Sequence, residues 1–248
     1  MQQTPQLTNQ QLVAHRGYQK LYPENTALSV TEAIKAGALF VEIDIQLSRD
    51  QQPVVYHDID LQRVSGCNGS LTDLCLHELE KLPAYEPKRF GRKFIGEPIS
   101  SLQSVVEIIQ QFPAVTLFVE LKEESIEHFD RQTMLSKVSE LLQPIAERTV
   151  LISFDYKIIQ SARDQGWPQV GVVLRNWQDI HSPQVTAIAG EYTFVNQTII
   201  PDDAELDQLN TELVAYEVGK IELARELRAR NIPMLETFDI RGLLGNRD

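Results

Sequence analysis

Short β-like runs alternate with helix-like stretches along most of the chain, and this alternation limits the possible fold more than any other feature of the sequence. Consecutive parallel strands need crossover connections, which helices usually supply, so the pattern predicts an α/β fold with a parallel sheet. Eight strands with intervening helices favour a closed barrel over an open sheet. The strand candidates are residues 12–15, 39–47, 115–122, 150–154, 170–174, 192–198, 213–218 and 232–238.

The length of the chain agrees with one barrel. Its 248 residues, 42% of them hydrophobic, can enclose a single sizeable core. We therefore predict a single (β/α)₈ TIM-barrel domain over residues 1–248. No Gly-x-Gly-x-x-Gly follows a predicted strand, so nothing indicates a Rossmann fold. Helices are expected from Asn25 or Thr26 to a stop at Gly37, and at residues 126–145, 156–165 and 221–230.

One predicted connection is too long for a barrel loop. The stretch from residue 48 to residue 114 far exceeds the usual loop and helix between two barrel strands. Part of it, at about residues 53–100, is predicted to be a small loop-rich lobe inserted after the second barrel strand. A short strand is expected at 53–57 and a short helix at 72–81. On the catalytic face, such a lobe would wall a substrate pocket.

Two acidic residues interrupt a strand that should be almost wholly apolar. In Val41-Glu42-Ile43-Asp44-Ile45 the two carboxylates are two residues apart and share one face. The apolar residues face the opposite way, toward the helices, so the carboxylates are predicted to face the barrel axis. Two buried like charges are costly without a cation, which favours a metal site; a solvated edge strand of an antiparallel sheet is the alternative.

A second strand repeats this anomaly. Glu120 and Lys122 lie on one face of the run 118–122, with apolar residues on the other. Glu120 could complete an oxygen-rich site with Glu42 and Asp44, which suits Mg²⁺ or Ca²⁺ better than zinc. Lys122 would then bind an anion beside the metal. A purely structural ion pair between Glu120 and Lys122 is the alternative.

Two histidines end strands close to these carboxylates. His15 is the last residue of the first predicted strand, and His57 is the last residue of the short strand predicted in the lobe. Phosphoester cleavage needs one group that takes a proton from the nucleophile and another that gives a proton to the leaving alkoxide. His15 and His57 are therefore the catalytic candidates. The remaining histidines lie in helix-like or loop segments and are expected at the surface: His77, His128 and His181.

The charge of the chain limits its partners. A formal net charge of −12 and a pI near 4.9 make the average surface repel nucleic acids and anionic membranes. Residues 1–11 are polar, and no segment approaches the roughly 20 apolar residues that span a bilayer. A cytoplasmic protein without a stable membrane anchor is expected, with its homo-oligomeric state left open. Cys67 and Cys75 are too few for a disulfide framework or a zinc site, which indicates two free thiols.

Five motifs together resemble the glycerophosphodiester phosphodiesterase family in order and approximate spacing: His15-Arg16-Gly17, Pro23-Glu24-Asn25-Thr26, Glu42-x-Asp44, Val54-Val55-x-His57-Asp58 and Glu120-Leu121-Lys122. The resemblance implies a TIM barrel with an inserted lobe. It further implies roles for named residues: Glu42, Asp44 and Glu120 as ligands of Mg²⁺ or Ca²⁺, His15 and His57 as acid and base, and Arg16 and Lys122 as phosphate binders.

The resemblance is weaker toward the C-terminus. Family members usually carry Trp-Thr-Val-Asn on the seventh strand, where this chain has Tyr216-Glu217-Val218-Gly219. Tyr216 is expected to replace the tryptophan as an apolar wall for the substrate's glycerol carbons. If the strand register differs by one residue, Glu217 faces the site instead.

The function that the resemblance implies is metal-dependent hydrolysis of glycerophosphodiesters to sn-glycerol 3-phosphate and an alcohol. A phospholipase of the sphingomyelinase D type, or a non-catalytic barrel that binds phosphodiesters, is the alternative. A metal-dependent amidohydrolase would instead need His-x-His on the first strand, which His15-Arg16-Gly17 does not provide. Fold alone does not separate these functions.

Overall fold

The computed structural model describes residues 7–245, so the first part of the polar segment 1–11 lies outside the described residues. Eight parallel strands close into a barrel in the order β1-β10-β9-β8-β7-β6-β5-β2, with β2 paired back to β1. The predicted fold class is confirmed. The barrel strands are β1 (Leu12–Ala14), β2 (Phe40–Leu47), β5 (Thr116–Leu121), β6 (Thr149–Ser153), β7 (Gln169–Leu174), β8 (Tyr192–Asn196), β9 (Glu212–Tyr216) and β10 (Met234–Thr237).

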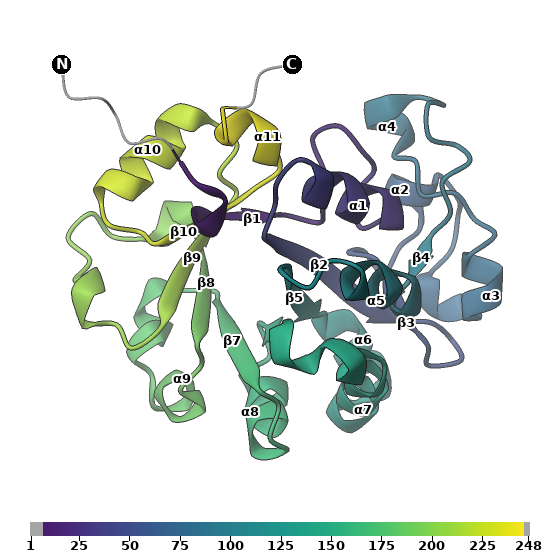
Figure 1. Cartoon of the computed structure of the whole chain (residues 1–248). Helices are drawn as coiled ribbons and strands as arrows, with labels where there is room; N and C mark the ends of the chain where they lie inside the picture. Colours follow the sequence, from purple (N-terminus) through teal and green to yellow (C-terminus); the bar gives the residue numbers. More distant parts are fainter. Residues whose placement is uncertain (1–6, 246–248) are drawn as a thin grey trace.

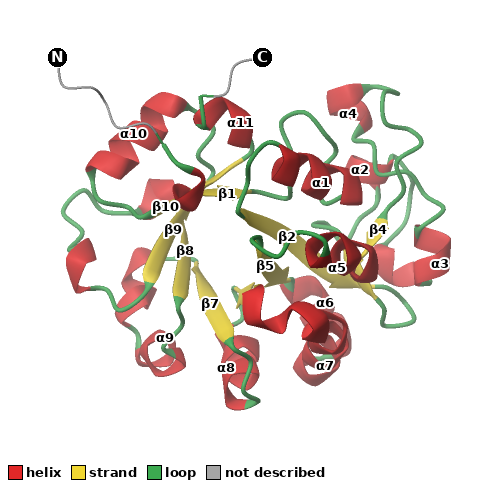
Figure 2. Cartoon of the chain, viewed as in Figure 1, coloured by secondary structure: helices red, strands yellow, loops and turns green. Residues whose placement is uncertain are grey.

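Helices form a ring around these strands, as Figures 1 and 2 show. The first begins after the N-cap Thr26, whose side chain accepts the Ser29 backbone N–H at 3.0 Å. It ends just before Gly37, where φ is 103°, as the predicted stop requires. The α-helices outside the lobe are α1 (Ala27–Lys35), α5 (Leu102–Gln110), α6 (Glu123–Phe129), α7 (Arg131–Leu142), α8 (Tyr156–Asp164), α9 (Pro183–Ile188), α10 (Ile221–Ala229) and α11 (Ile240–Leu243). The 3₁₀ helices there are η1 (Asn9–Gln11), η3 (Gln143–Arg148), η4 (Trp177–His181), η5 (Gln197–Ile199) and η6 (Leu206–Gln208).

The inserted lobe extends the sheet beyond β2. Strand β3 (Pro53–Val55) pairs antiparallel with the end of β2, and β4 (Ser100–Ser101) pairs antiparallel with β3. The lobe has its own small core of Val54, Tyr56, Leu61, Val64, Leu71, Leu79, Ala84 and Ile99. Its short helical segments are α2 (Gln62–Ser65), η2 (Leu71–Asp73), α3 (Leu76–Leu79) and α4 (Pro87–Phe90). Figure 1 shows this lobe in blue at one side of the barrel.

The barrel strands bury side chains on both faces. One layer fills the barrel interior and consists of Val13, Phe118, Val150, Ile152, Val173, Phe194, Val214 and Met234. Val41, Ile43 and Ile45 belong to the other layer, which includes apolar residues of the surrounding helices. Because side chains alternate along a strand, Glu42 and Asp44 face the interior, as predicted.

Two predicted helices differ from the observed ones. The predicted helix at 126–145 is divided between α6 and α7 at Asp130, where φ is 120°. The Asp130 carboxylate accepts the Thr133 backbone N–H at 2.8 Å and so caps α7, a role that favours aspartate. The predicted helix at 72–81 is reduced to η2 and α3, because local caps at Ser70 and Cys75 begin a separate short segment at each.

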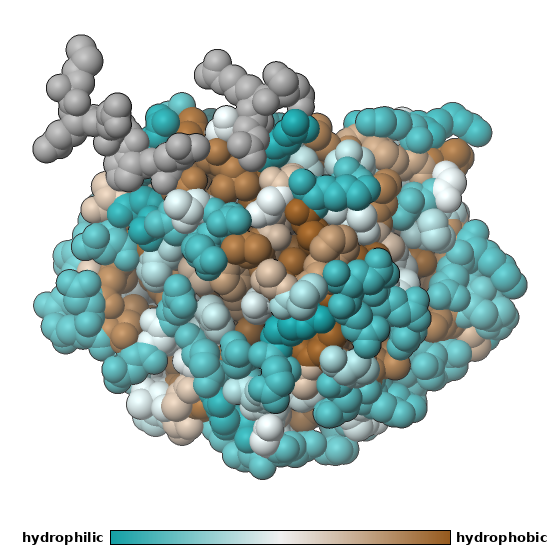
Figure 3. All heavy atoms as spheres, in the orientation of Figure 1, coloured by the Kyte–Doolittle hydropathy of each residue, from teal (hydrophilic) through white to brown (hydrophobic). Residues whose placement is uncertain are grey.

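The surface seen in Figure 3 is hydrophilic over most of its rim, while hydrophobic side chains gather toward its centre. Within residues 7–245, no helix has both the length and the apolar composition to cross a bilayer.

Candidate active site

A cavity of about 170 Å³ lies at the C-terminal ends of the barrel strands, the usual position of an active site in this fold. Three other cavities, of about 280, 310 and 270 Å³, are larger, but none of the three combines histidine, carboxylate and cationic side chains among its described lining residues, as the smaller cavity does. The smaller cavity is lined by all the predicted site residues except Asp44: His15, Arg16, Glu42, His57, Glu120, Lys122 and Tyr216. Phe154, Glu217 and Glu236 are among its other lining residues.

Glu42, Asp44 and Glu120 form a compact acidic group. One carboxylate oxygen of each lies within 4.8 Å of those of the other two, because Asp44 and Glu120 are register partners on β2 and β5. Burial, followed by the charges of Asp44 and Glu236, raises the pKa of Glu42 well above its usual value. Burial likewise raises the pKa of Glu120. These carboxylates are therefore costly to ionise unless a cation joins them.

Two nearby cationic side chains favour the ionised form of Asp44. Burial alone would raise its pKa, but the charges of Arg16 and Lys122 hold that pKa well below its usual range. Arg16 Nε lies 3.0 Å from Asp44 Oδ2, and Lys122 Nζ lies 3.5 Å from Oδ1. Asn25 donates to Asp44 Oδ2 at 2.8 Å and accepts the Asp44 backbone N–H at 3.1 Å. Asn25 thus fixes the orientation of this carboxylate.

The His15-Arg16-Gly17 motif forms a left-handed turn over the acidic group. Arg16 has φ 53° and Gly17 has φ 78°. A Cβ atom on Gly17 would lie 2.5 Å from the carbonyl carbon of Ser29, so only glycine fits. The turn allows the Arg16 backbone N–H to donate to Glu42 Oε2 at 3.0 Å. The motif therefore positions one carboxylate with its backbone and another with its side chain.

A chain of contacts links the second histidine to this turn. His57 Nδ1 lies 2.6 Å from Asp58 Oδ1, and Arg63 donates to both Asp58 oxygens at 2.6 and 3.0 Å. Arg63 also donates to both oxygens of Glu24, at 2.8 and 2.7 Å, and Arg16 donates to Glu24 at 2.9 Å. Burial would raise the pKa of Glu24, but these contacts lower it to about 2. The buried Glu24 thus ties the lobe to the barrel.

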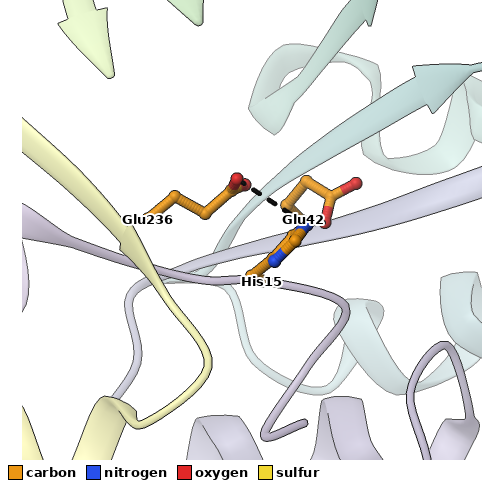
Figure 4. Close-up of side chains that lie close together, drawn as sticks. All are labelled: His15, Glu42 and Glu236. Carbon is orange, nitrogen blue, oxygen red and sulfur yellow. Dashed lines mark ion pairs between the residues drawn. The ribbon is translucent and has the colours of Figure 1, made fainter. Parts of the chain in front are cut away.

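His15 is neutral near pH 7. Burial first, and then the charge of Arg16, lowers its pKa to about 3. Its Nε2 lies 4.0 Å from Glu42 Oε2 and 3.9 Å from Glu236 Oε2. Figure 4 shows the side chains of His15, just after β1, of Glu42 on β2 and of Glu236 on β10 converging on one another. A neutral ring nitrogen at this position can accept either a proton or a cation.

Glu236 is a fourth inward carboxylate, absent from the predicted site. It is 3% exposed, and its Oε1 has no hydrogen-bond partner within the described part of the chain. Its signal in the sequence is the one that identified Glu42, an acidic residue in the otherwise apolar strand run Met234-Leu235-Glu236. Burial, and then the charge of Glu120, raises its pKa well above the usual value.

The donor set fits a divalent cation. Four buried or half-buried carboxylates face two cationic side chains in the site, and Asp44 contacts both of those cations. Glu42 and Glu236 have no charged lysine or arginine side-chain nitrogen within 4.0 Å among residues 7–245. The all-oxygen set of Glu42, Asp44 and Glu120 suits Mg²⁺ or Ca²⁺. Glu236 lies outside that set, and its Oε1 has no hydrogen-bond partner among residues 7–245.

Replacing Glu236 by glutamine is expected to stabilise the metal-free protein at pH 8. The folded-state pKa of Glu236 is raised above its unfolded value, so the carboxylate costs stability once the pH rises through the folded pKa. Removing a buried, unpaired charge should gain about 1–3 kcal/mol. The gain should shrink at pH 5, where the native carboxyl retains its proton.

Urea unfolding in EDTA at pH 5 and pH 8 measures this gain. Glu212→Gln, at an exposed position at the start of β9, is the matched control and should change stability by less than about 0.5 kcal/mol. A Glu236→Gln variant that is less stable than the wild type at pH 8 would contradict the assignment of Glu236 as an uncompensated charge.

Tyr216 points into the barrel, and Glu217 also reaches the cavity. Tyr216 packs against the interior layer while lining the cavity. Burial, followed by the charge of Glu120, raises its pKa to about 12. Glu217 has φ 66°, which ends the strand two residues before its predicted end at Val218, and its carboxylate accepts a hydrogen bond from Asn196 at 2.9 Å. The alternative register, with Tyr216 facing the helices, is therefore wrong.

Comparisons with known proteins point to one family. Residues 15–198 match the model of the glycerophosphoryl diester phosphodiesterase family, well over half of the chain. The protein YhdW of Bacillus subtilis (strain 168) is 26% identical over 237 residues, which cover 91% of this chain and 93% of that protein. A glycerophosphodiester phosphodiesterase of Caldanaerobacter subterraneus subsp. tengcongensis is 41% identical over 98 residues, or 40% of each chain.

A solved structure gives the same result. An Oleispira antarctica phosphodiesterase, solved in complex with the product sn-glycerol-3-phosphate, superposes with a TM-score of 0.84 at 25% sequence identity. The match covers 95% of each chain, so the likeness extends over the barrel and the lobe together.

Proposed function

The chain belongs to the glycerophosphoryl diester phosphodiesterase family and is therefore a phosphoric diester hydrolase, and we propose that it hydrolyses glycerophosphodiesters to sn-glycerol 3-phosphate and an alcohol. The observation that carries this proposal is the group of Glu42, Asp44 and Glu120 within 4.8 Å of one another, beside two histidines and two cationic side chains. The sn-glycerol-3-phosphate bound to the Oleispira antarctica enzyme supports the product.

Glu42, Asp44 and Glu120 are the proposed ligands of Mg²⁺ or Ca²⁺. When bound, the ion acts as a Lewis acid toward a phosphate oxygen and as a template for the glycerol hydroxyl. Two of these carboxylates are preorganised by hydrogen bonds: Asn25 orients Asp44, and the Arg16 backbone N–H orients Glu42. Such fixed ligands keep the cost of reorganisation low when substrate enters.

Arg16 and Lys122 are the proposed phosphate-binding residues. Both line the cavity, and both are held beside the carboxylates rather than extended into solvent. Lys122 is 8% exposed, and Asp44 and Glu120 raise its pKa against the lowering effect of burial. Each side chain therefore stays positively charged where a phosphodiester oxygen would arrive.

His15 and His57 are the proposed proton-transfer pair. Neutral His15 takes the proton of the attacking glycerol hydroxyl, and His57, whose Nδ1 lies 2.6 Å from Asp58 Oδ1, gives a proton to the leaving alkoxide. In this scheme the product of the first step is a cyclic phosphate. Water opens that ring in the second step, with the two histidines exchanging roles.

The free thiols suggest where the protein works. Cys67 and Cys75 are both unpaired, and neither is fully buried. Unpaired thiols persist in reducing compartments, so we propose a cytoplasmic location.

One assay tests the proposed function. Purified protein is incubated with Mg²⁺ or Ca²⁺ and a panel of glycerophosphodiesters that differ in the alcohol, and released glycerol 3-phosphate is coupled to its dehydrogenase. Turnover of at least one substrate supports the proposal and identifies the preferred head group. Cleavage of sphingomyelin or lysophospholipid instead would favour the sphingomyelinase D type. Binding without turnover would favour the non-catalytic barrel.

Replacing Tyr216 by alanine is expected to raise KM roughly tenfold with little change in kcat. The ring lines the cavity, and an apolar wall contacts the substrate about equally in the ground and transition states. Tyr216→Phe, which keeps the ring, and Tyr216→Trp should be tolerated. Steady-state kinetics and melting temperature are measured on the same preparations. A loss of stability without any change in KM would mean that the ring serves only the barrel interior.

A further inference from the structure

Glu236 lies beside His15 in the cavity, and the proposed function gives this buried carboxylate no role. The Glu236 carboxylate lies on the cavity wall and is buried, and its Oε1 has no hydrogen-bond partner among residues 7–245. In that same part of the chain, His15 is the one basic side chain within 4.0 Å of it. A polar group so deeply buried normally has a partner, and the cavity is the side from which one could arrive.

The geometry around Glu236 is that of a cation position. One ligand atom from each of His15, Glu42 and Glu236 lies within 4.8 Å of those of the other two. His15 Nε2 is 3.9 Å from Glu236 Oε2 and 4.0 Å from Glu42 Oε2. Two atoms that each bind one ion at about 2.0–2.2 Å lie no more than about 4.4 Å apart, so small side-chain rotations complete the set.

Glu42 belongs to both acidic groups. It contributes an oxygen to the set with Asp44 and Glu120 and an oxygen to the set with His15 and Glu236. A carboxylate shared in this way places two ions about 3.5–4 Å apart, as in two-metal sites. The second set differs in chemistry because it contains an imidazole nitrogen, which Mg²⁺ and Ca²⁺ bind poorly and Mn²⁺ or Zn²⁺ accept.

We propose that His15, Glu42 and Glu236 form a second, weaker divalent-cation position, selective for Mn²⁺ or Zn²⁺ over Mg²⁺, and that its occupation inhibits the enzyme. The binding part stands on the geometry alone. The inhibitory part rests on the proposed function, because an ion on His15 Nε2 takes the electron pair with which His15 would accept the proton of the attacking hydroxyl.

Counting bound Mn²⁺ tests the binding part without any turnover. Metal-free protein is titrated with Mn²⁺, and the six-line electron paramagnetic resonance signal of free Mn²⁺ gives the number of ions bound per chain. The wild type and the exposed control Glu212→Gln should bind two ions, one more weakly than the other. Glu236→Gln should bind one. His15→Asn should also bind one, which keeps the test valid if Glu236→Gln fails to fold.

Activity measured over the same Mn²⁺ range tests the inhibitory part. In the wild type, activity should rise and then fall by on the order of tenfold or more as the weaker position fills. In Glu236→Gln it should rise to a plateau, and Mg²⁺ should give a plateau in both proteins. One Mn²⁺ per wild-type chain, or two per Glu236→Gln chain, would overturn the second position. Two ions without a fall in activity would overturn inhibition.

The two proposals fail in different ways. A wild type that binds one Mn²⁺ and still releases glycerol 3-phosphate refutes the second position and leaves the proposed function standing. A wild type that binds two Mn²⁺ ions and turns over no glycerophosphodiester with any cation refutes the proposed function and leaves the second cation position standing.

Discussion

Chelation of divalent cations is expected to lower phosphodiesterase activity by on the order of 10³-fold or more, and Mg²⁺, Ca²⁺ or Mn²⁺ should restore it. Glu42 and Glu120 have raised pKa values in the metal-free site, and Asp44 is already paired with Arg16 and Lys122. Without an ion, these carboxyl groups keep their protons or pair with Arg16 and Lys122, and they offer no Lewis acid that could polarise a phosphodiester.

Melting temperatures with and without cation separate loss of chemistry from loss of structure. Cation binding to the folded state alone should raise the melting temperature of the metal-free protein. Asp44→Asn should weaken that rise, whereas Glu212→Gln at the exposed start of β9 should not. Full turnover by metal-free protein in EDTA would remove the metal from the mechanism.

Replacing either His15 or His57 by alanine is expected to lower kcat by on the order of 10²–10⁴ while leaving cation binding at the main site in place. Each side chain lines the cavity, and neither belongs to the group of Glu42, Asp44 and Glu120. The double variant should lose much less than the product of the single effects, because both histidines serve one proton-transfer cycle.

His77→Ala is the matched control, since His77 is an exposed histidine of the lobe. Its kcat should stay within twofold of the wild type, or roughly 0.4 kcal/mol. A near wild-type kcat in either His15→Ala or His57→Ala would identify that residue as an ordinary loop histidine. Asp58→Asn should lower kcat in part, because it removes the negative charge beside His57 Nδ1.

The barrel and its acidic centre could be predicted because burial on both faces makes a parallel strand intolerant of charge. Glu42, Asp44 and Glu120 are exceptions to an apolar rule, and side-chain alternation assigns each to the interior. The surface histidines were predicted for a different reason, their place in helix-like or loop segments, and the structure leaves His77, His128 and His181 exposed, as predicted.

Other parts of the site could not be predicted because they depend on contacts between distant residues. Glu24 accepts hydrogen bonds from Arg63, 39 positions later, and Asn25 contacts Asp44, 19 positions later. Polarity on a loop carries no signal of such partners, as loops are polar in any case. Glu236 is different, because the sequence does show an acidic residue within the four-residue strand β10. It was not predicted as a site residue because β10 lacks the second inward acidic residue that β2 has two positions away.

Closure of the barrel has a consequence for how the chain folds. Strand β10 is the last barrel strand to be synthesised, and it pairs with β1 through Leu235, Glu236 and Thr237. Until that pairing forms, β1 and β9 each present an open edge, and Glu236 remains apart from Glu42. Barrel closure is therefore the event that brings Glu236 beside His15 and Glu42, whereas Glu42, Asp44 and Glu120 meet through the pairing of β2 with β5. Glu42 and Glu236 both have raised pKa values in the closed barrel, so bringing these two carboxyl groups together works against the closure of β10 onto β1.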